Sequence, residues 1–152
     1  MKNNFESKFG YKIKTIKELK KEIGNFPRKK KVIMCHGTFD IVHPGHVRHL
    51  LFAKERADIL IVTLTCDKYV SKANYRPFIT ETLRAINLAV LDFVDYVIID
   101  KNDTPIKNLI SIQPDFFAKG FEYDRKNVAK ATLEEIKALN TYGGQIIYTP
   151  GD

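Results

Sequence analysis

The sequence contains no tryptophan and only two cysteines and two methionines among its 152 residues. Two cysteines are too few for a disulfide framework, and both Cys35 and Cys66 stand in apolar runs. We therefore expect two buried free thiols, as in proteins of a reducing compartment, and predict a cytoplasmic location. No apolar run approaches the roughly 20 residues that a membrane-spanning helix needs, and the first residues contain no apolar core of a signal peptide.

Acidic residues are fewer than basic ones, 18 against 25, and the formal net charge is +7. A basic chain can bind nucleic acid. However, the lysines that cluster between residues 12 and 31 have few aromatic neighbours on which bases could stack. We therefore assign the excess charge to a site for an anionic small molecule and to solvated lysines. We expect neither nucleic acid nor a membrane as a partner.

Internal repeats, low-complexity tracts and linkers are also absent, which favours a single domain. Short apolar runs alternate with amphipathic helical segments. Residues 58–65 are almost all apolar or β-branched, which indicates a parallel strand covered on both faces. The alternation predicts an α/β fold with a Rossmann-like, doubly wound, five-stranded parallel sheet. The predicted strands are 32–35, 58–65, 94–99, 115–118 and 145–149, and the predicted helices are 15–24, 45–57, 80–91, one after Pro105 and one from Thr132.

Two T-x-x-E patterns predict helix starts with a capping box, Thr15 with Glu18 and Thr132 with Glu135. The helical spacing of apolar residues predicts which side chains face the sheet. These predicted buried residues are Val47, Leu50, Leu51, Ala57, Leu83, Ile86, Val90, Leu91, Ile106, Leu109, Ile110, Leu133, Ile136 and Leu139.

Residues 31–51 carry the clearest functional signal. An apolar strand is followed by Gly37-Thr38-Phe39-Asp40 and then by His43-Pro44-Gly45-His46, after which apolar residues recur at helical spacing. The N-terminus of a helix has free N–H groups and a partial positive charge, so it binds phosphates. Two histidines at this position would add hydrogen-bond donors there. The stretch therefore predicts a site that binds a nucleoside triphosphate and acts on it.

His43-Pro44-Gly45-His46 resembles the H-x-G-H signature of the cytidylyltransferase-like nucleotidyltransferases. With Gly37–Asp40 in front, it is similar to the branch of glycerol-3-phosphate cytidylyltransferase and to the nucleotidyltransferase domain of ADP-heptose synthase. This resemblance implies transfer of CMP or AMP from CTP or ATP to a sugar phosphate or polyol phosphate, with release of pyrophosphate. The stretch Lys119-Gly120-Phe121-Glu122-Tyr123 looks most like the heptose-type branch, although Glu122 replaces its usual aspartate.

The resemblance covers about residues 31–150. It implies an N-terminal extension with a short helix at 1–30 and a nucleotidyltransferase domain at 31–152. The family carries a Ser/Thr-rich motif after its last strand, whereas this sequence continues only to Thr149-Pro150-Gly151-Asp152. We therefore expect the domain to lack its C-terminal motif.

The resemblance also implies roles for single residues. His43, His46, Lys72 and Arg84 are assigned to catalysis, with Arg84 contacting phosphate through a pattern similar to the family's E-x-x-R. Asp67 and Arg76 are assigned to the acceptor. Asp40 orients a donor, helps to hold a metal or only stabilises the turn, and His36 and His49 are interpreted as structural. The residues assigned to nucleotide binding are Gly37, Thr38, Phe39, Asp40, His43, Gly45, His46, Lys119 and Gly120.

The sequence offers few carboxylates that could cage a metal, so we predict no dedicated metal site and expect Mg²⁺ to arrive with the triphosphate. The resemblance implies a homodimer and a possible sugar kinase domain or partner. Two alternatives stay open: an adenylyltransferase for a cofactor precursor, and a nucleotide- or nucleic-acid-binding module without catalysis. The pattern specifies neither the base nor the acceptor.

Overall fold

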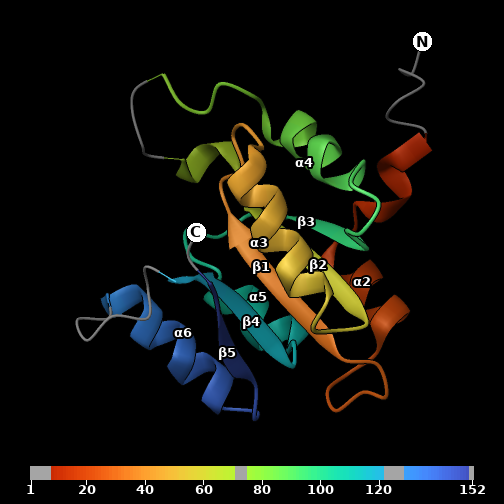
Figure 1. Cartoon of the computed structure of the whole chain (residues 1–152), viewed down its shortest axis with the longest axis vertical. Helices are drawn as coiled ribbons and strands as arrows, with labels where there is room; N and C mark the ends of the chain where they lie inside the picture. The colour runs from red at the N-terminus through yellow and green to blue at the C-terminus, as the bar shows by residue number, and fades with distance from the viewer. Residues whose placement is uncertain (1–7, 71–74, 122–128, 151–152) are drawn as a thin grey trace.

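The computed structural model describes residues 8–70, 75–121 and 129–150. Its centre is a parallel sheet of five strands in the order β3-β2-β1-β4-β5 (Figure 1). This arrangement confirms the predicted doubly wound, Rossmann-like α/β fold. The strands are β1 (Val32–Gly37), β2 (Ile59–Thr65), β3 (Tyr96–Asp100), β4 (Phe116–Gly120) and β5 (Gln145–Thr149).

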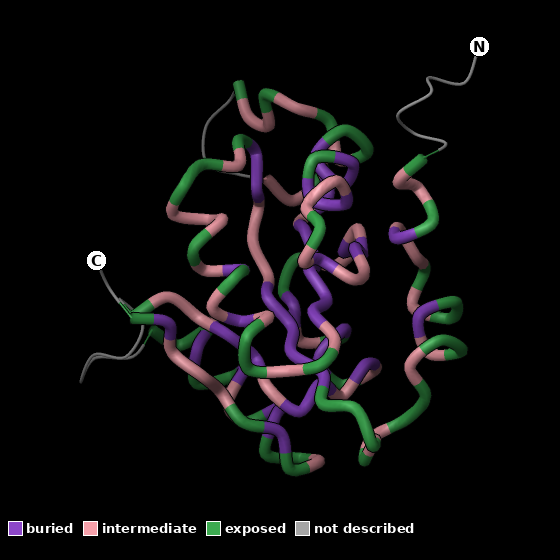
Figure 2. Tube along the Cα trace, turned by 45° about the vertical axis from the view of Figure 1, so that its right-hand side comes forward, coloured by how far each residue is buried: buried purple, intermediate pink, exposed green. Residues whose placement is uncertain are grey.

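Helices cover both faces of the sheet, and the buried residues gather between the layers (Figure 2). On one face, α3 (Pro44–Lys54) and α4 (Glu81–Ala89) pack against Ile33 and Cys35. On the other, α2 (Ile16–Ile23) and α5 (Ile106–Ile112) pack against Val32 and Met34. Leu139 of α6 (Lys130–Asn140) joins this second layer. Since side chains alternate along a strand, consecutive β1 residues face different helix layers.

The helices bury different residues from those predicted at four positions. Leu51, Leu83, Ile110 and Leu133 are exposed. The predictions for Leu50, Ile86, Leu109 and Leu139 are confirmed, since all four are buried. For Leu51 and Leu83 the reason is geometric: α3 and α4 approach the sheet partly through small side chains. The buried alanines, which bring each helix close to the strands and leave larger neighbours at its rim, are Ala53, Ala85 and Ala89.

One of the two predicted capping boxes is confirmed. At the start of α2, Thr15 Oγ1 accepts from the Glu18 N–H at 3.2 Å, and Glu18 Oε1 accepts from the Thr15 N–H at 3.4 Å. The second prediction is wrong: α6 begins at Lys130 with Ala129 as its N-cap, so Thr132 and Glu135 lie inside the helix. Both are buried, and Glu135 pairs with a lysine of β4 instead of capping a helix.

The described part of the predicted N-terminal extension lies against the sheet. The short helix predicted there is α2, and the 3-10 turn η1 (Gly10–Lys12) precedes it. Between them, Ile13 forms a parallel bridge with Val97 of β3, and the Lys14 N–H donates to Val97 O at 2.9 Å. Cys35 and Cys66 are buried free thiols, as predicted. In the described ranges, no helix has the length and apolarity needed to cross a membrane.

Candidate active site

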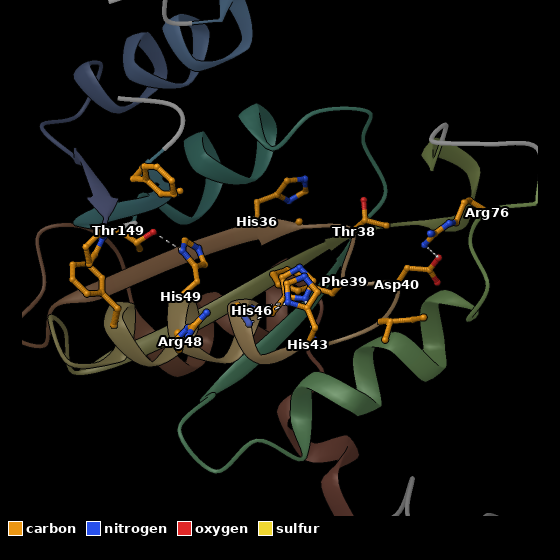
Figure 3. A pocket seen from close by; sticks show the side chains of 17 residues that line it. His36, Thr38, Phe39, Asp40, His43, His46, Arg48, His49, Arg76 and Thr149 are labelled. Carbon is orange, nitrogen blue, oxygen red and sulfur yellow. Dashed lines mark hydrogen bonds and ion pairs between the residues drawn. The ribbon is translucent and has the colours of Figure 1, made fainter. Parts of the chain in front are cut away.

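A cavity of about 830 Å³ opens at the carboxyl ends of β1 and β4 (Figure 3). From β1 the chain continues to β2 and β3 on one side of the sheet and to β4 and β5 on the other. Ligands of open α/β sheets bind at such a reversal of strand order. Of the residues assigned to the site from sequence, those that line this cavity are Gly37, Thr38, Phe39, Asp40, His43, Gly45, His46, Arg76 and Gly120.

The turn after β1 is shaped by Phe39. Its backbone has a φ of 51°, a left-handed conformation that a bulky residue rarely adopts. Its ring is buried, lies edge-on to the His46 ring at a centroid distance of 5.1 Å, and covers Gly37. A Cβ on Gly37 would lie 3.0 Å from the Phe39 ring. Gly37 is therefore needed for the packing of Phe39, which in turn supports His46.

His43 is the N-cap of α3, and its imidazole replaces the usual short polar cap. Its Nδ1 accepts from the backbone N–H groups of Gly45 at 3.1 Å and His46 at 3.4 Å. In return, His46 Nδ1 accepts from the His43 N–H at 3.3 Å. An Nδ1 that accepts carries no proton, so each neutral ring carries its proton on Nε2. The two rings stack at a centroid distance of 3.7 Å.

The H-x-G-H sequence thus builds a pair of Nε2–H donors at the start of a helix. Pro44 occupies the first turn, where a missing N–H costs nothing. Gly45 is required by the ring beside it, because a Cβ there would lie 2.9 Å from His43 Cε1. The local backbone therefore selects the tautomer of both histidines. Such donors can stabilise negative charge that develops on phosphate oxygens.

Asp40 anchors the segment before α4. Its carboxylate accepts from the N–H groups of Phe78 and Ile79, each at 3.0 Å, and pairs with Arg76 at 2.7 Å. Burial by itself would raise the pKa of the Asp40 carboxyl, but these hydrogen bonds hold it below its usual value. These contacts fit two of the roles considered for Asp40, since the carboxylate orients the Arg76 guanidinium and also holds backbone N–H groups. The same ion pair places Arg76 at the rim of the cavity (Figure 3).

Arg84 has a different place from the one predicted. Its side chain has no exposed surface, and its guanidinium donates to the carbonyl oxygens of Thr38, Thr65 and Ile79 at 2.7 to 2.8 Å. It also pairs with Asp67 at 2.6 Å. A direct phosphate contact does not fit this placement, because the guanidinium is enclosed by protein oxygens. Arg84 is a positioning residue that ties the turn after β1 to the end of β2.

Other predicted site residues lie apart from the cavity or outside the described residues. Lys119 pairs with Glu135 at 2.5 Å, on the side of the sheet that α6 covers. Asp67 is held by Arg84, and its N–H donates to Glu81 at 3.1 Å. Lys72 lies outside the described residues. The catalytic, nucleotide and acceptor roles assigned to the site residues stay predictions.

Two histidines interpreted as structural line the cavity. His36 lies at the end of β1, and His49 of α3 shares a hydrogen bond of 3.1 Å with Thr149 at the end of β5. For His36 the signal was its place directly before Gly37, at the carboxyl end of a strand. For His49 it was its place one turn after His46 along the helix. Neither residue belongs to the H-x-G-H pattern.

Among the described residues, no group of three or more His, Cys, Asp or Glu side chains could hold a metal ion. Asp40, the carboxylate that lines the cavity beside the turn, contacts Arg76 and two backbone N–H groups. The Mg²⁺ expected to arrive with the triphosphate stays a prediction.

Comparison with known proteins identifies the family of the chain. The family model described as "Cytidylyltransferase-like" matches residues 34–148. The bifunctional protein HldE of Campylobacter concisus (strain 13826) is 38% identical over 148 residues, which cover 95% of this chain and 31% of that protein. The bifunctional protein HldE of Helicobacter pylori (strain P12) is 42% identical over 102 residues, 66% of this chain and 22% of that protein. The chain thus spans about a third or less of the length of these relatives.

Solved structures share the fold. A lipopolysaccharide core biosynthesis protein from Thermoplasma volcanium GSS1 superposes with a TM-score of 0.67 and 27% identity, covering 81% of this chain and 98% of that chain. Pantoate-beta-alanine ligase from Francisella tularensis superposes with a TM-score of 0.65 over 92% of this chain and 67% of that chain. At 16% identity, this second likeness shows a common fold alone.

Proposed function

Since the chain belongs to the cytidylyltransferase-like family, and is by that membership a nucleotidyltransferase, we propose that it transfers a nucleotidyl group to a sugar phosphate or polyol phosphate. The observation that carries this proposal is the pair of neutral histidines, His43 and His46, at the start of α3. Their backbone contacts place the ring protons on Nε2, at the reversal point of the sheet where ligands bind.

The proposed reaction is a single displacement. An oxygen of the acceptor's phosphate attacks the α-phosphorus of CTP or ATP and forms a new P–O bond. The bond from the α-phosphorus to the bridging oxygen breaks, and pyrophosphate leaves with the electron pair. Such phosphoryl chemistry needs alignment of the reactants and stabilisation of the charge on the phosphate oxygens, with little covalent help from the protein.

The side chains of this site supply both requirements. The Nε2–H groups of His43 and His46 donate to phosphate oxygens, and the N-terminus of α3 adds its partial positive charge. Phe39 holds the His46 ring from the side. Arg84 holds the turn through Thr38 O, so the donors stay in place as charge moves. Mg²⁺ carried by the triphosphate would neutralise part of its negative charge.

We propose a heptose-type sugar phosphate as the acceptor, with a polyol phosphate as the related possibility. Three of the similar proteins bear on this proposal: the two HldE proteins are bifunctional by name, and the Thermoplasma neighbour is named for lipopolysaccharide core biosynthesis. The same relatives support a proposal that a sugar kinase, as a further domain or a separate partner, makes the acceptor phosphate. The homodimer and the cytoplasmic location stay predictions.

Pyrophosphate release tests the proposed function. The protein and Mg²⁺ are incubated with CTP, ATP, GTP or UTP, each paired with glycerol 3-phosphate or with one of a panel of hexose and heptose 1-phosphates. We expect release that requires one nucleotide and one acceptor. Nucleotide binding without release for any pair would contradict the transferase and would support the alternative of a binding module. Release only when a cofactor precursor replaces the sugar or polyol phosphate would support an adenylyltransferase for such a precursor. No observation on this chain favours the binding module or the cofactor-precursor enzyme.

A further inference from the structure

A second polar cluster lies at the carboxyl edge of the sheet, on the face opposite the histidine pair. The His36 cluster, as we name it, consists of His36 of β1, Thr63 and Thr65 of β2, and Asp100 of β3. The strand register places His36 beside Thr63, and Thr65 beside Asp100. Figure 3 shows His36 on the other side of the β1 ribbon from His43 and His46. No motif in the sequence joins these four residues.

The surroundings of His36 Nδ1 favour one tautomer of the ring. Thr63 Oγ1 lies 2.7 Å from His36 Nδ1 and can accept from it while the Thr63 hydroxyl donates to Cys35 O at 3.4 Å. Asp100 Oδ2 lies 3.9 Å from the same nitrogen and has no hydrogen-bond partner among the described residues. The Asp100 carboxylate favours a proton on Nδ1, which then donates to Thr63 Oγ1. His36 Nε2 is therefore a hydrogen-bond acceptor. Thr65 Oγ1 lies 3.4 Å from Nε2, longer than an ordinary hydrogen bond, so a closer hydroxyl donor can replace it.

The charge of His36 follows from its surroundings. Burial, with a smaller contribution from the Lys119 ammonium, lowers the pKa of the His36 imidazole to about 4. The ring is therefore neutral near pH 7. A neutral ring with an unprotonated Nε2 repels a phosphate oxygen and accepts from a hydroxyl group. This is the reverse of His43 and His46, whose Nε2 atoms donate.

His36 lines the same cavity as the histidine pair, and 16% of its side chain is exposed. In the proposed reaction the acceptor's phosphate must reach the α-phosphorus that His43 and His46 serve. The rest of the acceptor then extends to another part of the cavity wall. On that wall, His36 Nε2 can accept a hydrogen bond from the substrate. Thr63, which is fully buried, holds the His36 ring in place.

We propose that His36 Nε2 accepts a hydrogen bond from a hydroxyl group of the sugar phosphate or polyol phosphate substrate. The His36 cluster would thereby select phosphates of sugars or polyols. This inference rests on the proposed function and extends it to the choice of substrate. It makes His36 a specificity-determining residue rather than a group that acts on the α-phosphorus. Thr63 is the positioning residue that holds the ring through Nδ1.

The test compares acceptors that differ by one hydroxyl group. The working sugar or polyol phosphate from the pyrophosphate assay is compared with its monodeoxy analogues, for example glycerol 3-phosphate with 3-hydroxypropyl phosphate. The wild-type protein is expected to prefer the full acceptor over one analogue by roughly tenfold in kcat/KM, the size expected for one hydrogen bond to a buried group. His36→Phe should lose this preference through a raised KM for the full acceptor. The KM for the nucleotide should not change.

Three controls separate the possible outcomes. His36→Gln keeps a side-chain oxygen that can accept, so it should regain part of the preference. Thr63→Val should weaken the preference, whereas Thr141→Val, remote from the cavity at the end of α6, should leave it unchanged. Thermal unfolding of each variant shows whether it folds. An unchanged preference in folded His36→Phe would overturn the inference, while absence of pyrophosphate release in the wild-type protein would overturn the proposed function itself.

Discussion

The two sides of β1 carry histidines of opposite hydrogen-bonding character. On the α3 side, His43 and His46 are neighbours in the sequence, and each takes its tautomer from backbone N–H groups within the same helical turn. On the other side, the His36 ring is held by Thr63, 27 positions away, and takes its tautomer from Asp100, 64 positions away. His43 and His46 donate hydrogen bonds through Nε2, whereas His36 accepts through Nε2. One cavity is thus lined both by hydrogen-bond donors that neighbouring residues orient and by a histidine whose partners the sheet brings together.

The largest expected effect is on catalysis and comes from removing the histidines on the α3 side of β1. His43→Ala and His46→Ala should each lower the rate of pyrophosphate release by roughly 10²-fold or more, because each removes one donor at the developing charge. His43→Asn is the matched variant, since asparagine is a good N-cap but lacks the imidazole. It should restore the roughly 1 kcal/mol of stability lost in His43→Ala without restoring the rate. Near-normal turnover in the alanine variants would refute the assignment of both histidines.

The next effect is on stability and comes from Arg84, which connects the turn after β1 to the end of β2. Arg84→Met leaves the carbonyl oxygens of Thr38, Thr65 and Ile79 without their donor, and should lower the free energy of unfolding by about 2 to 3 kcal/mol. Arg56→Met, which removes exposed contacts to Phe52 O and to the face of the Phe52 ring, should cost less than about 1 kcal/mol. Urea unfolding measures both. If Arg84→Met kept full stability but lost activity, Arg84 would contact phosphate after all.

The smallest effect sharpens the contrast in charge. The pKa of His36 is about 4 in the folded protein and about 6.5 in an unfolded chain. Below pH 6.5 the unfolded state therefore binds more protons at this position, and the contribution of His36 to stability falls as the pH drops from 6.5 towards 4. Relative to His36→Gln, the wild-type protein should lose about 2 to 4 °C in Tm between about pH 6.5 and pH 5.5, which corresponds to about 1 kcal/mol. Parallel pH dependence of the two proteins would show that His36 is not held neutral by its surroundings.

Much of the fold followed from pattern. The β2 strand was predicted from an apolar run, because parallel strands buried on both faces require one. The start of α2 was predicted from Thr15 and Glu18, since a capping box needs only residues of a single turn. The same pattern failed at Thr132 and Glu135, because α6 begins at Lys130 and Glu135 forms an ion pair with Lys119 of β4.

The candidate site divides in the same way. His43, Gly45 and His46 were identified because the turn that orients them is encoded within four consecutive residues. Arg84 was assigned to phosphate because its E-x-x-R pattern shows a cation on a helix but does not show which oxygens that cation meets. His36 was interpreted as structural because its partners come from β2 and β3, and only the strand register reveals them.

The sequence by itself determined the order of helices and strands, the parallel character of the sheet and the hydrogen-bonded histidine turn at the start of α3. Each of these depends on the spacing of apolar residues or on hydrogen bonds between near neighbours, which the order of residues specifies directly. Only the tertiary structure decided that Arg84 is enclosed by carbonyl oxygens and that His36 meets Thr63 and Asp100. Those contacts exist because β1 lies between β2 and β4, and the order of strands in a sheet is set by the packing of the whole chain.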